Sequence, residues 1–553
     1  MPDESAQPAP AASVQAAELL ATARRWLDAE PDDDIRAELD ALVRHAASGD
    51  GDELAARFEG SLQFGTAGLR AAVAAGSMRM NRLVVRQAAA GLGQWLFDTV
   101  PDAATRGVVI ARDARRKSDL FALDTARVLA AMGVRSMLLP GVQPTPVLAW
   151  SITGLSAAAG VVVTASHNPP ADNGYKVYLD TGSQIVAPID TEIADRIARF
   201  DPIEIALAEP DDPLIERLDQ SWTDAYVAAA PSVRLRPDAP GVTVAYTAMH
   251  GVGGAVVERA FAAAGFPPPV VVNAQHQPDG TFPTVSFPNP EEPGAMDLLL
   301  EEAASSGAAV ALANDPDADR LGAAIPQADG SWRRLAGDEI GWLFADHILS
   351  NTTGDDRLVV TTLVSSALLA EMAADHGVHS EETFTGFKWI GKIATERTEL
   401  RFVFGYEQAL GYLVTGRPLD KDGITAAVMM AEVAAVAASE GATIEDRLDA
   451  IADRYGRHVT AELSVRIPPS VGADWVAALE ASPPAAIGGR PVVDVMSFPE
   501  ANLIRLMLEG GVRLQVRPSG TEPKVKLYGE AVDVDRGTLD SLLDSLAALA
   551  PSP

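Results

Sequence analysis

Cysteine is absent from this sequence of 553 residues. Disulfides, thiolate zinc sites, iron–sulfur clusters and cysteine nucleophiles are therefore excluded. Lysine is scarce as well, because only seven of the 44 basic residues are lysine and the rest are arginine. In such a chain a lysine can mark a place that needs a compact, movable ammonium group, although codon bias explains the same scarcity. The seven are Lys117, Lys176, Lys388, Lys392, Lys421, Lys524 and Lys526.

A secretory leader and long apolar runs are missing too. The first 13 residues are acidic and rich in Pro and Ala, without the basic start and apolar stretch of a signal peptide. No apolar run reaches the roughly 18–20 residues of a membrane span. The longest, 426–438, is interrupted by Glu432 and is typical of a buried helix. We therefore expect a cytoplasmic protein.

The charge balance excludes a class of partners. With 76 acidic and 44 basic residues, the net charge is −32, which repels nucleic-acid phosphates and anionic lipid heads. We expect neither nucleic acid nor a membrane as a partner. A small phosphorylated ligand stays possible where cations gather in one cleft. The 47% hydrophobic and 6% aromatic content is that of a globular protein.

The order of apolar segments predicts several domains. At about 150 residues per domain, the length suggests three or four. Short Val- and Ile-rich runs alternate with helical stretches from residue 107 to 438, which favours βαβ units and mainly parallel sheets. After Tyr455 the alternation stops. We expect an α/β fold with three related domains of mixed or parallel sheet and a C-terminal α+β domain. The predicted divisions are a tail and helical extension over 1–58, then domains over 59–232, 233–336, 337–454 and 455–553.

The first motif with chemical potential is Thr164-Ala165-Ser166-His167-Asn168-Pro169, directly after a predicted strand. Ligands of open α/β sheets bind beyond the carboxyl ends of strands. A serine there suits a nucleophile or a phosphate carrier, and His167 can assist either role. A plain turn stabilised by a hydroxyl side chain is the alternative.

The second motif is Asp315-Pro316-Asp317-Ala318-Asp319-Arg320, after another predicted strand. Three alternate carboxylates in a stiff loop need a counter-ion, and a hard divalent cation is the natural one. An EF-hand is excluded because Arg320 stands where that loop needs Gly. Arg320 beside the acids also suggests a phosphate partner. A solvated acidic turn is the alternative.

Three further motifs supply anion-binding and polar groups. The loop 517–524 offers a guanidinium, hydroxyls, backbone N–H groups and an ammonium, which together make a phosphate cradle; its candidate residues are Arg517, Ser519, Gly520, Thr521 and Lys524. The turn 405–412 contains Glu407, and the segment 385–389 contains Lys388. No Walker A or GxGxxG pattern occurs, which argues against NTPases and dehydrogenases.

The joint arrangement points to a reaction class. Each predicted domain contributes one loop, and each loop follows a predicted strand. Together they supply a hydroxyl, a carboxylate metal site, a Glu suited to sugar hydroxyls and a phosphate cradle. These parts predict phosphoryl transfer on a small polar substrate, in which catalysis is positioning plus charge neutralisation.

With these motifs in this order, the chain from Phe64 to its end resembles the α-D-phosphohexomutase family, and most closely its long phosphoglucomutase/phosphopentomutase-like branch. The resemblance implies four domains around a central cleft. It implies a mutase that interconverts sugar 1-phosphate and 6-phosphate through a phosphoserine enzyme and a sugar bisphosphate. Glucose is the favoured sugar, with mannose or pentose possible. Mg²⁺ and a sugar 1,6-bisphosphate are the implied cofactors, a phosphosugar the partner, and a monomer or homodimer the expected assembly.

The resemblance also implies residue roles. Ser166 would carry the phosphoryl group, and its oxygen would complete a Mg²⁺ site made by Asp315, Asp317 and Asp319. Arg70, in Phe64-Gly65-Thr66-Ala67-Gly68-Leu69-Arg70, and Lys176, ten residues after Ser166, would assist proton transfer. Lys388 would orient the sugar, Glu407 would hold its hydroxyls, and the loop 517–524 would grip the non-reacting phosphate.

Three departures from the family pattern alter these expectations. Ala409 stands where many relatives have Ser, and Tyr412 stands where phosphomannomutase-like relatives often have His, so we expect changed hydroxyl recognition. Ala71 replaces a common Gly, which is tolerable unless the backbone there has positive φ. Three other functions use similar residues: a glucose 1,6-bisphosphate synthase, a phosphatase, and a non-catalytic phosphosugar-binding relative. The retention of Ser166 and of all three Asp disfavours the last.

Overall fold

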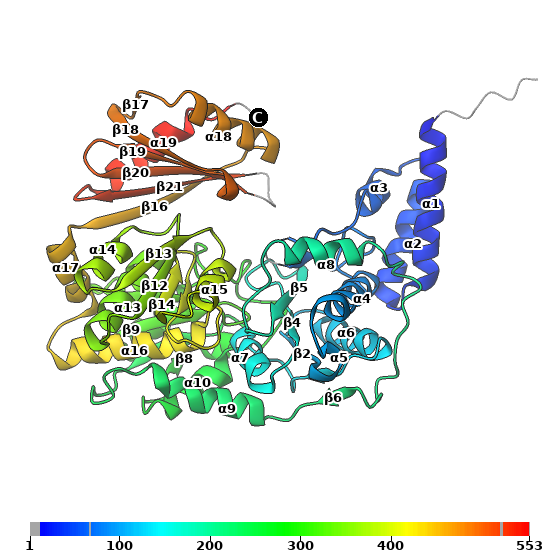
Figure 1. Cartoon of the computed structure of the whole chain (residues 1–553), viewed down its shortest axis with the longest axis horizontal. Helices are drawn as coiled ribbons and strands as arrows, with labels where there is room; N and C mark the ends of the chain where they lie inside the picture. The colour runs from blue at the N-terminus through cyan, green and yellow to red at the C-terminus, as the bar shows by residue number, and fades with distance from the viewer. Residues whose placement is uncertain (1–10, 66–67, 520–523, 552–553) are drawn as a thin grey trace, which may run out of the picture.

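The computed structural model describes residues 11–65, 68–519 and 524–551. The described chain opens with three helices, α1 (Ala11–Ala29), α2 (Asp33–Ala47) and α3 (Asp52–Phe58). We call residues 11–58 the N-terminal arm, which projects from the rest of the molecule at the blue end of the chain (Figure 1). Buried Trp26, Ile35 and Leu54 join the apolar core of the first domain, so the arm packs on this chain itself.

Domain 1 is built on a six-stranded sheet in the order β1-β5-β4-β2-β3-β6. Strands β4, β2, β3 and β6 are parallel to one another. At one edge β5 pairs antiparallel with β4, and β1 pairs antiparallel with β5. Runs such as Val-Val-Ile-Ala-Arg are almost wholly apolar because helices cover the parallel strands. The elements are β1 (Leu69–Ala72), α4 (Arg82–Thr99), α5 (Ala103–Arg106), β2 (Val108–Arg112), α6 (Ser118–Ala131), β3 (Ser136–Leu138), α7 (Thr145–Leu155), β4 (Ala159–Val163), β5 (Asp172–Leu179), α8 (Ile189–Ile197) and β6 (Ile215–Arg217).

Domain 2 repeats this plan in the order β11-β10-β9-β7-β8, with β8, β7 and β9 parallel and two antiparallel strands after them. The loop between β9 and β10 holds the Asp315–Arg320 motif. The elements are α9 (Ser221–Ala229), η1 (Ala230–Val233), β7 (Val244–Thr247), α10 (Gly254–Ala263), β8 (Val270–Val271), α11 (Asn273–His276), α12 (Asp297–Ser306), β9 (Val310–Asn314), β10 (Leu321–Pro326) and β11 (Trp332–Arg334).

Domain 3 has a four-stranded sheet in the order β13-β12-β14-β15, of which only β15 is antiparallel. Its elements are α13 (Gly337–Asn351), β12 (Arg357–Thr362), α14 (Leu368–Asp375), β13 (His379–Thr383), α15 (Phe387–Glu396), β14 (Arg401–Glu407), β15 (Gly411–Leu413), α16 (Gly423–Ser439) and α17 (Ile444–Tyr455).

Domain 4 is a different kind of fold, an antiparallel sheet in the order β16-β21-β20-β19-β18-β17. Three α/β domains followed by an α+β domain confirm the predicted fold class. The elements are β16 (His458–Val465), α18 (Pro469–Ala481), β17 (Ala486–Ile487), β18 (Arg490–Phe498), η2 (Pro499–Ala501), β19 (Leu503–Leu508), β20 (Val512–Pro518), β21 (Val525–Val532) and α19 (Arg536–Ala547).

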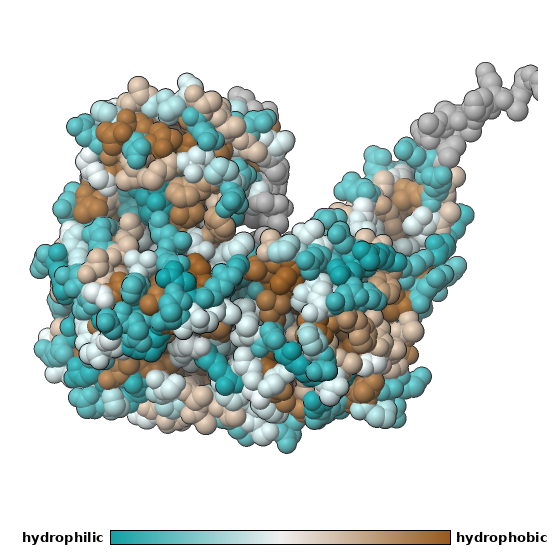
Figure 2. Space-filling view, in the orientation of Figure 1, coloured by the Kyte–Doolittle hydropathy of each residue, from teal (hydrophilic) through white to brown (hydrophobic). Residues whose placement is uncertain are grey.

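The apolar cores show which domains are fused. One buried cluster runs through domains 1, 2 and 3 and includes Val109, Tyr246 and Phe344. Domain 4 has a core of its own and meets domain 3 through a small apolar cluster with Leu363 and Leu503. Figure 2 shows domain 4 rising above the body of the molecule, with an open recess between it and the N-terminal arm. Four domains therefore surround a cleft. The predicted domain boundaries themselves stay predictions.

Two motifs differ in local structure from the loops expected. Glu407 is the last residue of strand β14, and only 408–410 connect it to β15, so the motif 405–412 is a β-hairpin. Strand pairing extends to Glu407 because Phe404 and Tyr406 are buried in the sheet. Lys388 lies in the first turn of α15 rather than in a loop.

Helix α16 contains the apolar run seen in the sequence and is buried along most of its length. Glu432 within it is also fully buried and accepts hydrogen bonds from Arg234 Nε and from the N–H groups of Leu235 and Arg236. Among the described residues no single helix is long and apolar enough to cross a membrane. The pair α16 and α17 passes that test on length and composition only when taken together, although the two meet at 87°.

Candidate functional site

Ser166 lies at the carboxyl end of β4, in a backbone conformation rare for any residue but Gly. Its φ is +52°, and its N–H donates to Thr164 Oγ1 at 2.9 Å. Its Oγ donates to Asp315 Oδ2 at 2.7 Å. His167 Nδ1 lies 3.2 Å from Ser166 Oγ. The structure thus brings together the first two motifs, which are 149 residues apart in sequence.

Arg115 holds the loop that presents Ser166. Its Nη2 donates to the carbonyls of Ser166 at 2.5 Å and Asn168 at 2.6 Å. Its Nη1 donates to the carbonyls of Pro169 at 2.7 Å and Asp172 at 3.0 Å. The sequence reasoning missed this residue. The available signal was its place just after β2, which neighbours β4 in the sheet.

Asp315, Asp317 and Asp319 form the carboxylate cluster that the sequence predicts. All three are buried, and one oxygen of each lies within 4.8 Å of the others. Burial and the two neighbouring carboxylates raise the pKa of Asp315 well above its ordinary value. Asp317 Oδ1 and Asp319 Oδ1 are buried without a hydrogen-bond partner. Converging oxygens of this kind fit a hard divalent cation.

Two lysines face the cluster. Lys176 Nζ, on β5, donates to Asp317 Oδ2 at 2.6 Å and to Asp319 Oδ2 at 2.9 Å. Lys421 Nζ lies 3.4 Å from Asp319 Oδ2. Burial alone would raise the pKa of Asp319, but Lys176 and Lys421 hold it well below its ordinary value. Two of the seven lysines therefore lie at the carboxylate cluster.

Two arginines and a histidine lie next to Ser166. Arg70 and Arg320 supply positive charge, and His167 supplies an imidazole. Arg70 Nη1 donates to Asn168 Oδ1 at 3.1 Å. The Nε atoms of Arg70 and Arg320 are buried without a partner. Burial, together with Arg320 and Arg70, holds the pKa of His167 well below its usual range, so the imidazole is neutral at pH 7.

The hairpin of domain 3 is tied to the metal loop of domain 2. The N–H of Leu321 donates to the carbonyl of Leu410 at 3.0 Å. Glu407 Oε1 accepts from the N–H of Gly386 at 2.9 Å. The buried Nζ of Lys388 lies 3.8 Å from Asp190 Oδ2 of domain 1. The sugar-orienting role of Lys388 stays a prediction.

The phosphate loop of domain 4 is described in part. Arg517 lies in β20, paired in register with Lys526, and the N–H of Ser519 donates to the carbonyl of Lys524 at 2.9 Å. Gly520 and Thr521 lie outside the described residues. Their assignment to phosphate binding stays a prediction.

The three departures from the family pattern have separate outcomes. The Tyr412 hydroxyl donates to the carbonyl of Gly337 at 2.9 Å, and its ring is fully buried against Phe344. Tyr412 is thus a core residue, and the expectation of changed hydroxyl recognition stays a prediction. Ala409 is half-buried beside Glu407. Ala71 lies in β1 and is not among the described residues with positive φ, as its tolerance requires.

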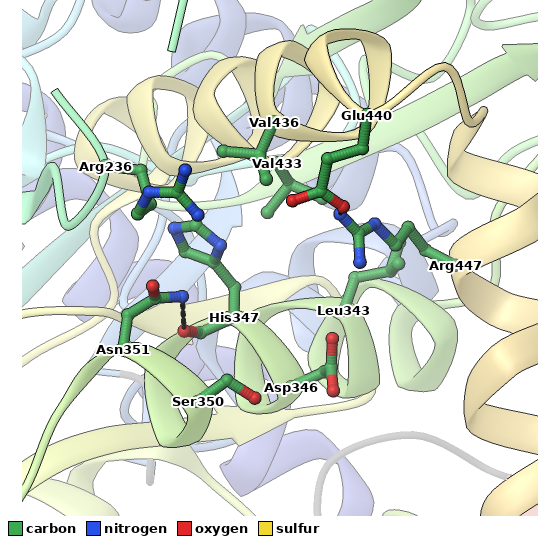
Figure 3. Close-up of a pocket in the computed structure, with 10 residues that line it drawn as sticks. All are labelled: Arg236, Leu343, Asp346, His347, Ser350, Asn351, Val433, Val436, Glu440 and Arg447. Atoms are coloured by element: carbon green, nitrogen blue, oxygen red, sulfur yellow. Dashed lines mark hydrogen bonds and ion pairs between the residues drawn. The ribbon is translucent and has the colours of Figure 1, made fainter. Parts of the chain in front are cut away.

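A second hollow, of about 230 Å³, lies elsewhere on domain 3 (Figure 3). Helices α13, α16 and α17 line it, with Arg236 at one side. Arg447 and Glu440 form an ion pair across it, and Asn351 Nδ2 donates to the carbonyl of His347 at 2.7 Å. None of the predicted site residues lines it.

Family models match nearly the whole chain after the arm. The descriptions are phosphoglucomutase/phosphomannomutase, alpha/beta/alpha domain I at residues 61–203, domain II at 221–329 and domain III at 336–455, and C-terminal domain at 431–548.

Curated relatives cover most of the chain. A probable phosphomannomutase of Haemophilus influenzae is 42% identical, over 84% of this chain and 96% of its own. A human phosphopentomutase is 33% identical, over 89% and 88%. A human glucose 1,6-bisphosphate synthase is 32% identical, over 92% and 89%.

Solved structures share the fold. The crystal structure of a putative phosphomannomutase from Thermus thermophilus superposes with a TM-score of 0.71 at 23% identity, covering 89% of this chain and 99% of that one. With the four domain matches and these relatives, the resemblance seen in the sequence is confirmed: this chain belongs to the phosphoglucomutase/phosphomannomutase family of enzymes.

Proposed function

We propose that this enzyme is a phosphosugar mutase that interconverts a sugar 1-phosphate and the corresponding 6-phosphate through phospho-Ser166 and a sugar bisphosphate. Glucose phosphates are the favoured substrates, with mannose or pentose phosphates as alternatives. The observation that carries the proposal is the 2.7 Å contact between Ser166 Oγ and Asp315 Oδ2, within a buried cluster of three carboxylates. The names of the relatives, phosphomannomutase and phosphopentomutase, support the same reaction class.

The proposed transfer has two halves. In the first half the bond between phosphorus and Ser166 Oγ breaks as phosphorus bonds to a sugar hydroxyl oxygen; that hydroxyl gives up its proton and the released Ser166 Oγ takes one up. In the second half the other phosphate of the bisphosphate returns to Ser166 Oγ; the serine proton must leave, and the sugar oxygen that is released takes up a proton. His167 Nδ1 and Asp315 Oδ2 lie 3.2 and 2.7 Å from Oγ, so each is within reach of the serine proton.

Mg²⁺ is the metal that we assign to Asp315, Asp317 and Asp319. Their buried, unpartnered oxygens suit it, and when bound it would neutralise charge on the transferring phosphoryl group. Arg70 and Lys176 lie at the same place, where we propose that they hold and relay protons of sugar hydroxyls. Lys176 already donates to two of the carboxylates, so its ammonium lies beside the reacting group.

The binding of the sugar is assigned to domains 3 and 4. Glu407 lies at the end of β14, where its carboxylate suits a pair of ring hydroxyls. Arg320 lies opposite Gly411 of the same hairpin. Arg517, Ser519, Gly520, Thr521 and Lys524 would grip the phosphate that does not react. The cytoplasmic location and the monomeric or homodimeric state stay predictions from the sequence.

The test is a coupled assay of glucose 1-phosphate conversion to glucose 6-phosphate, with Mg²⁺ and catalytic glucose 1,6-bisphosphate. Mannose 1-phosphate and ribose 1-phosphate run in parallel. Ser166→Ala should abolish turnover, and Ser331→Ala, at an exposed turn of domain 2, should not. Turnover that needs metal and Ser166 establishes the mutase. A folded wild-type protein without turnover on all three sugars overturns it.

A second candidate is a glucose 1,6-bisphosphate synthase, favoured by the 32% identical human enzyme of that name. It would use the same Ser166 loop and an external phosphoryl donor. Supplying glucose 1-phosphate with such a donor and following the bisphosphate separates the two. Bisphosphate that accumulates in proportion to donor consumed identifies the synthase, whereas a constant bisphosphate level identifies the mutase.

A further inference from the structure

The turn between α1 and α2 of the N-terminal arm carries acidic residues that face inward. Asp32 is only 7% exposed, although it carries a charge. The arm precedes residue 61, where the first family model begins to match. Charged groups are rarely buried unless they are paired, so these acids have partners elsewhere.

One partner is Arg82 of α4, whose Nη1 lies 3.2 Å from Asp32 Oδ1. The other is the loop between β2 and α6, residues 113–117. Lys117 Nζ lies 3.0 Å from Asp32 Oδ2 and 2.8 Å from Asp34 Oδ1, and its side chain is 11% exposed. Arg116 also pairs with Asp34. Lys117 has a φ of +64°, a conformation that a long side chain seldom adopts unless contacts hold it.

The same loop contains Arg115, which fixes the Ser166 loop by four hydrogen bonds to carbonyls. A second link runs beside it, because Asn173 Nδ2 donates to the carbonyl of Arg116 at 3.0 Å. The connection therefore runs from Asp34 to Lys117, along two residues of backbone to Arg115, and from Arg115 to the backbone of Ser166. A residue at φ +52° keeps that conformation only where its surroundings dictate it.

We propose that the N-terminal arm is a positioning element of the phosphotransfer site. Asp32 and Asp34 hold Lys117, Lys117 sets the loop that bears Arg115, and Arg115 holds Ser166 in line with the carboxylate cluster. Lys117 is a positioning residue, because it acts through Arg115 and not on the sugar. The catalytic part of this inference rests on the proposed function; the ordering of the Ser166 loop does not.

The test compares Lys117→Met, which keeps length but removes the charge, with Lys117→Arg, which restores it. Lys392→Met is the matched control, since Lys392 pairs with Glu396 on the surface of α15. We expect Lys117→Met to lower kcat about tenfold with KM unchanged within about twofold, and to slow phosphorylation of Ser166 by glucose 1,6-bisphosphate equally. Lys117→Arg should recover most of the rate, and Lys392→Met should match wild type.

A readout that needs no sugar separates this inference from the proposed function. Hydrogen exchange of the segment 164–172 should quicken in Lys117→Met and stay at the wild-type rate in Lys392→Met, whatever the enzyme acts on. If Lys117→Met fails to fold, Asp34→Asn removes one of the two carboxylates that pair with Lys117, at a half-exposed position. It should also quicken hydrogen exchange of the segment 164–172 and lower kcat, by smaller amounts. Wild-type exchange in that segment overturns the proposal, as does a loss in kcat that Lys117→Arg fails to rescue.

Discussion

Glu530 fastens domain 4 to domain 3 through a buried ionic network. Its carboxylate accepts from Arg513 Nη2 at 2.6 Å and lies 3.0 Å from His458 Nδ1, both in domain 4. From domain 3 it accepts the Ser366 hydroxyl and the N–H of Ala367 at 3.1 Å. We predict that Glu530→Gln weakens this junction and destabilises domain 4, because Arg513 is left buried beside a neutral amide.

The magnitude follows from the pKa. Burial alone would raise the pKa of Glu530, but Arg513, His458 and Ser366 together lower it from 4.5 to about 2. That difference between the unfolded and folded pKa corresponds to about 3 kcal/mol of unfolding free energy. A lowered acid pKa stabilises above the unfolded pKa, so this contribution is complete above pH 5 and fades as pH falls from 4.5 to 2. Breaking a buried ion pair costs about 3–5 kcal/mol in other proteins, which agrees.

The assay is urea unfolding at pH 7, with hydrogen exchange of peptides from β16, β20 and β21 to report on domain 4 itself. Glu462→Gln is the control, because Glu462 is in the same sheet but forms a half-exposed pair with Lys526 and should cost under about 1 kcal/mol. Equal stability of Glu530→Gln and wild type at pH 7 would refute the reasoning. So would a Glu530→Gln protein that still loses as much stability as wild type between pH 4.5 and 2.

Three more predictions concern residues near this junction. Burial raises the pKa of Asp338 to about 6, so its charged form destabilises the fold above pH 6. Asp338→Asn should therefore raise the unfolding free energy by up to about 3 kcal/mol at pH 7.5 and by little at pH 4. Equal gains at both pH values in urea titrations would contradict this. A Cβ at Gly337 would lie 1.7 Å from the carbonyl oxygen of Gln408, so Gly337→Ala should cost about 3 kcal/mol or more in thermal unfolding. Gly416→Ala, whose added Cβ would have no atom within 4 Å, should be nearly neutral. Equal melting temperatures of the two variants would show that the hairpin moves aside without cost. Tyr412→Phe should lower the unfolding free energy by about 1 kcal/mol, because the Tyr412 hydroxyl donates to the Gly337 carbonyl. The ranking of glucose, mannose and ribose phosphates in the coupled assay should stay unchanged. A new ranking would show that the hydroxyl contacts the sugar.

Local chemistry was readable from the sequence wherever a motif follows a strand. The alternation of apolar runs predicted the three α/β domains and the change of fold after Tyr455. Ser166 and the three Asp were recognisable because their residue types and spacing suffice to state what they can bind. The two motifs follow strands of two different sheets, β4 and β9, and the packing of domain 1 on domain 2 brings Ser166 into contact with Asp315.

Strand and helix ends near the site were less readable. Glu407 was taken for a loop residue, but its strand continues through alternating buried aromatics to pair with β15. Lys388 was placed in a loop, whereas it lies in the first turn of α15 with its ammonium 3.8 Å from Asp190 Oδ2. Tyr412 read as a substitution in a binding loop, whereas packing against Phe344 makes it a core residue. Each depends on which face an element buries, and that is decided by its neighbours in space.

The sequence by itself determined the fold class and pointed to the serine loop and the carboxylate cluster, because each motif is a short stretch of residues whose chemistry acts locally. Only the tertiary structure decided which groups hold those residues in place. Arg115 binds backbone carbonyls, which every residue offers and which leave no mark in the sequence. Lys117 and Glu530 find partners more than 80 residues away, and the free energy of such pairs comes from burial and distance, which exist only once the chain has folded.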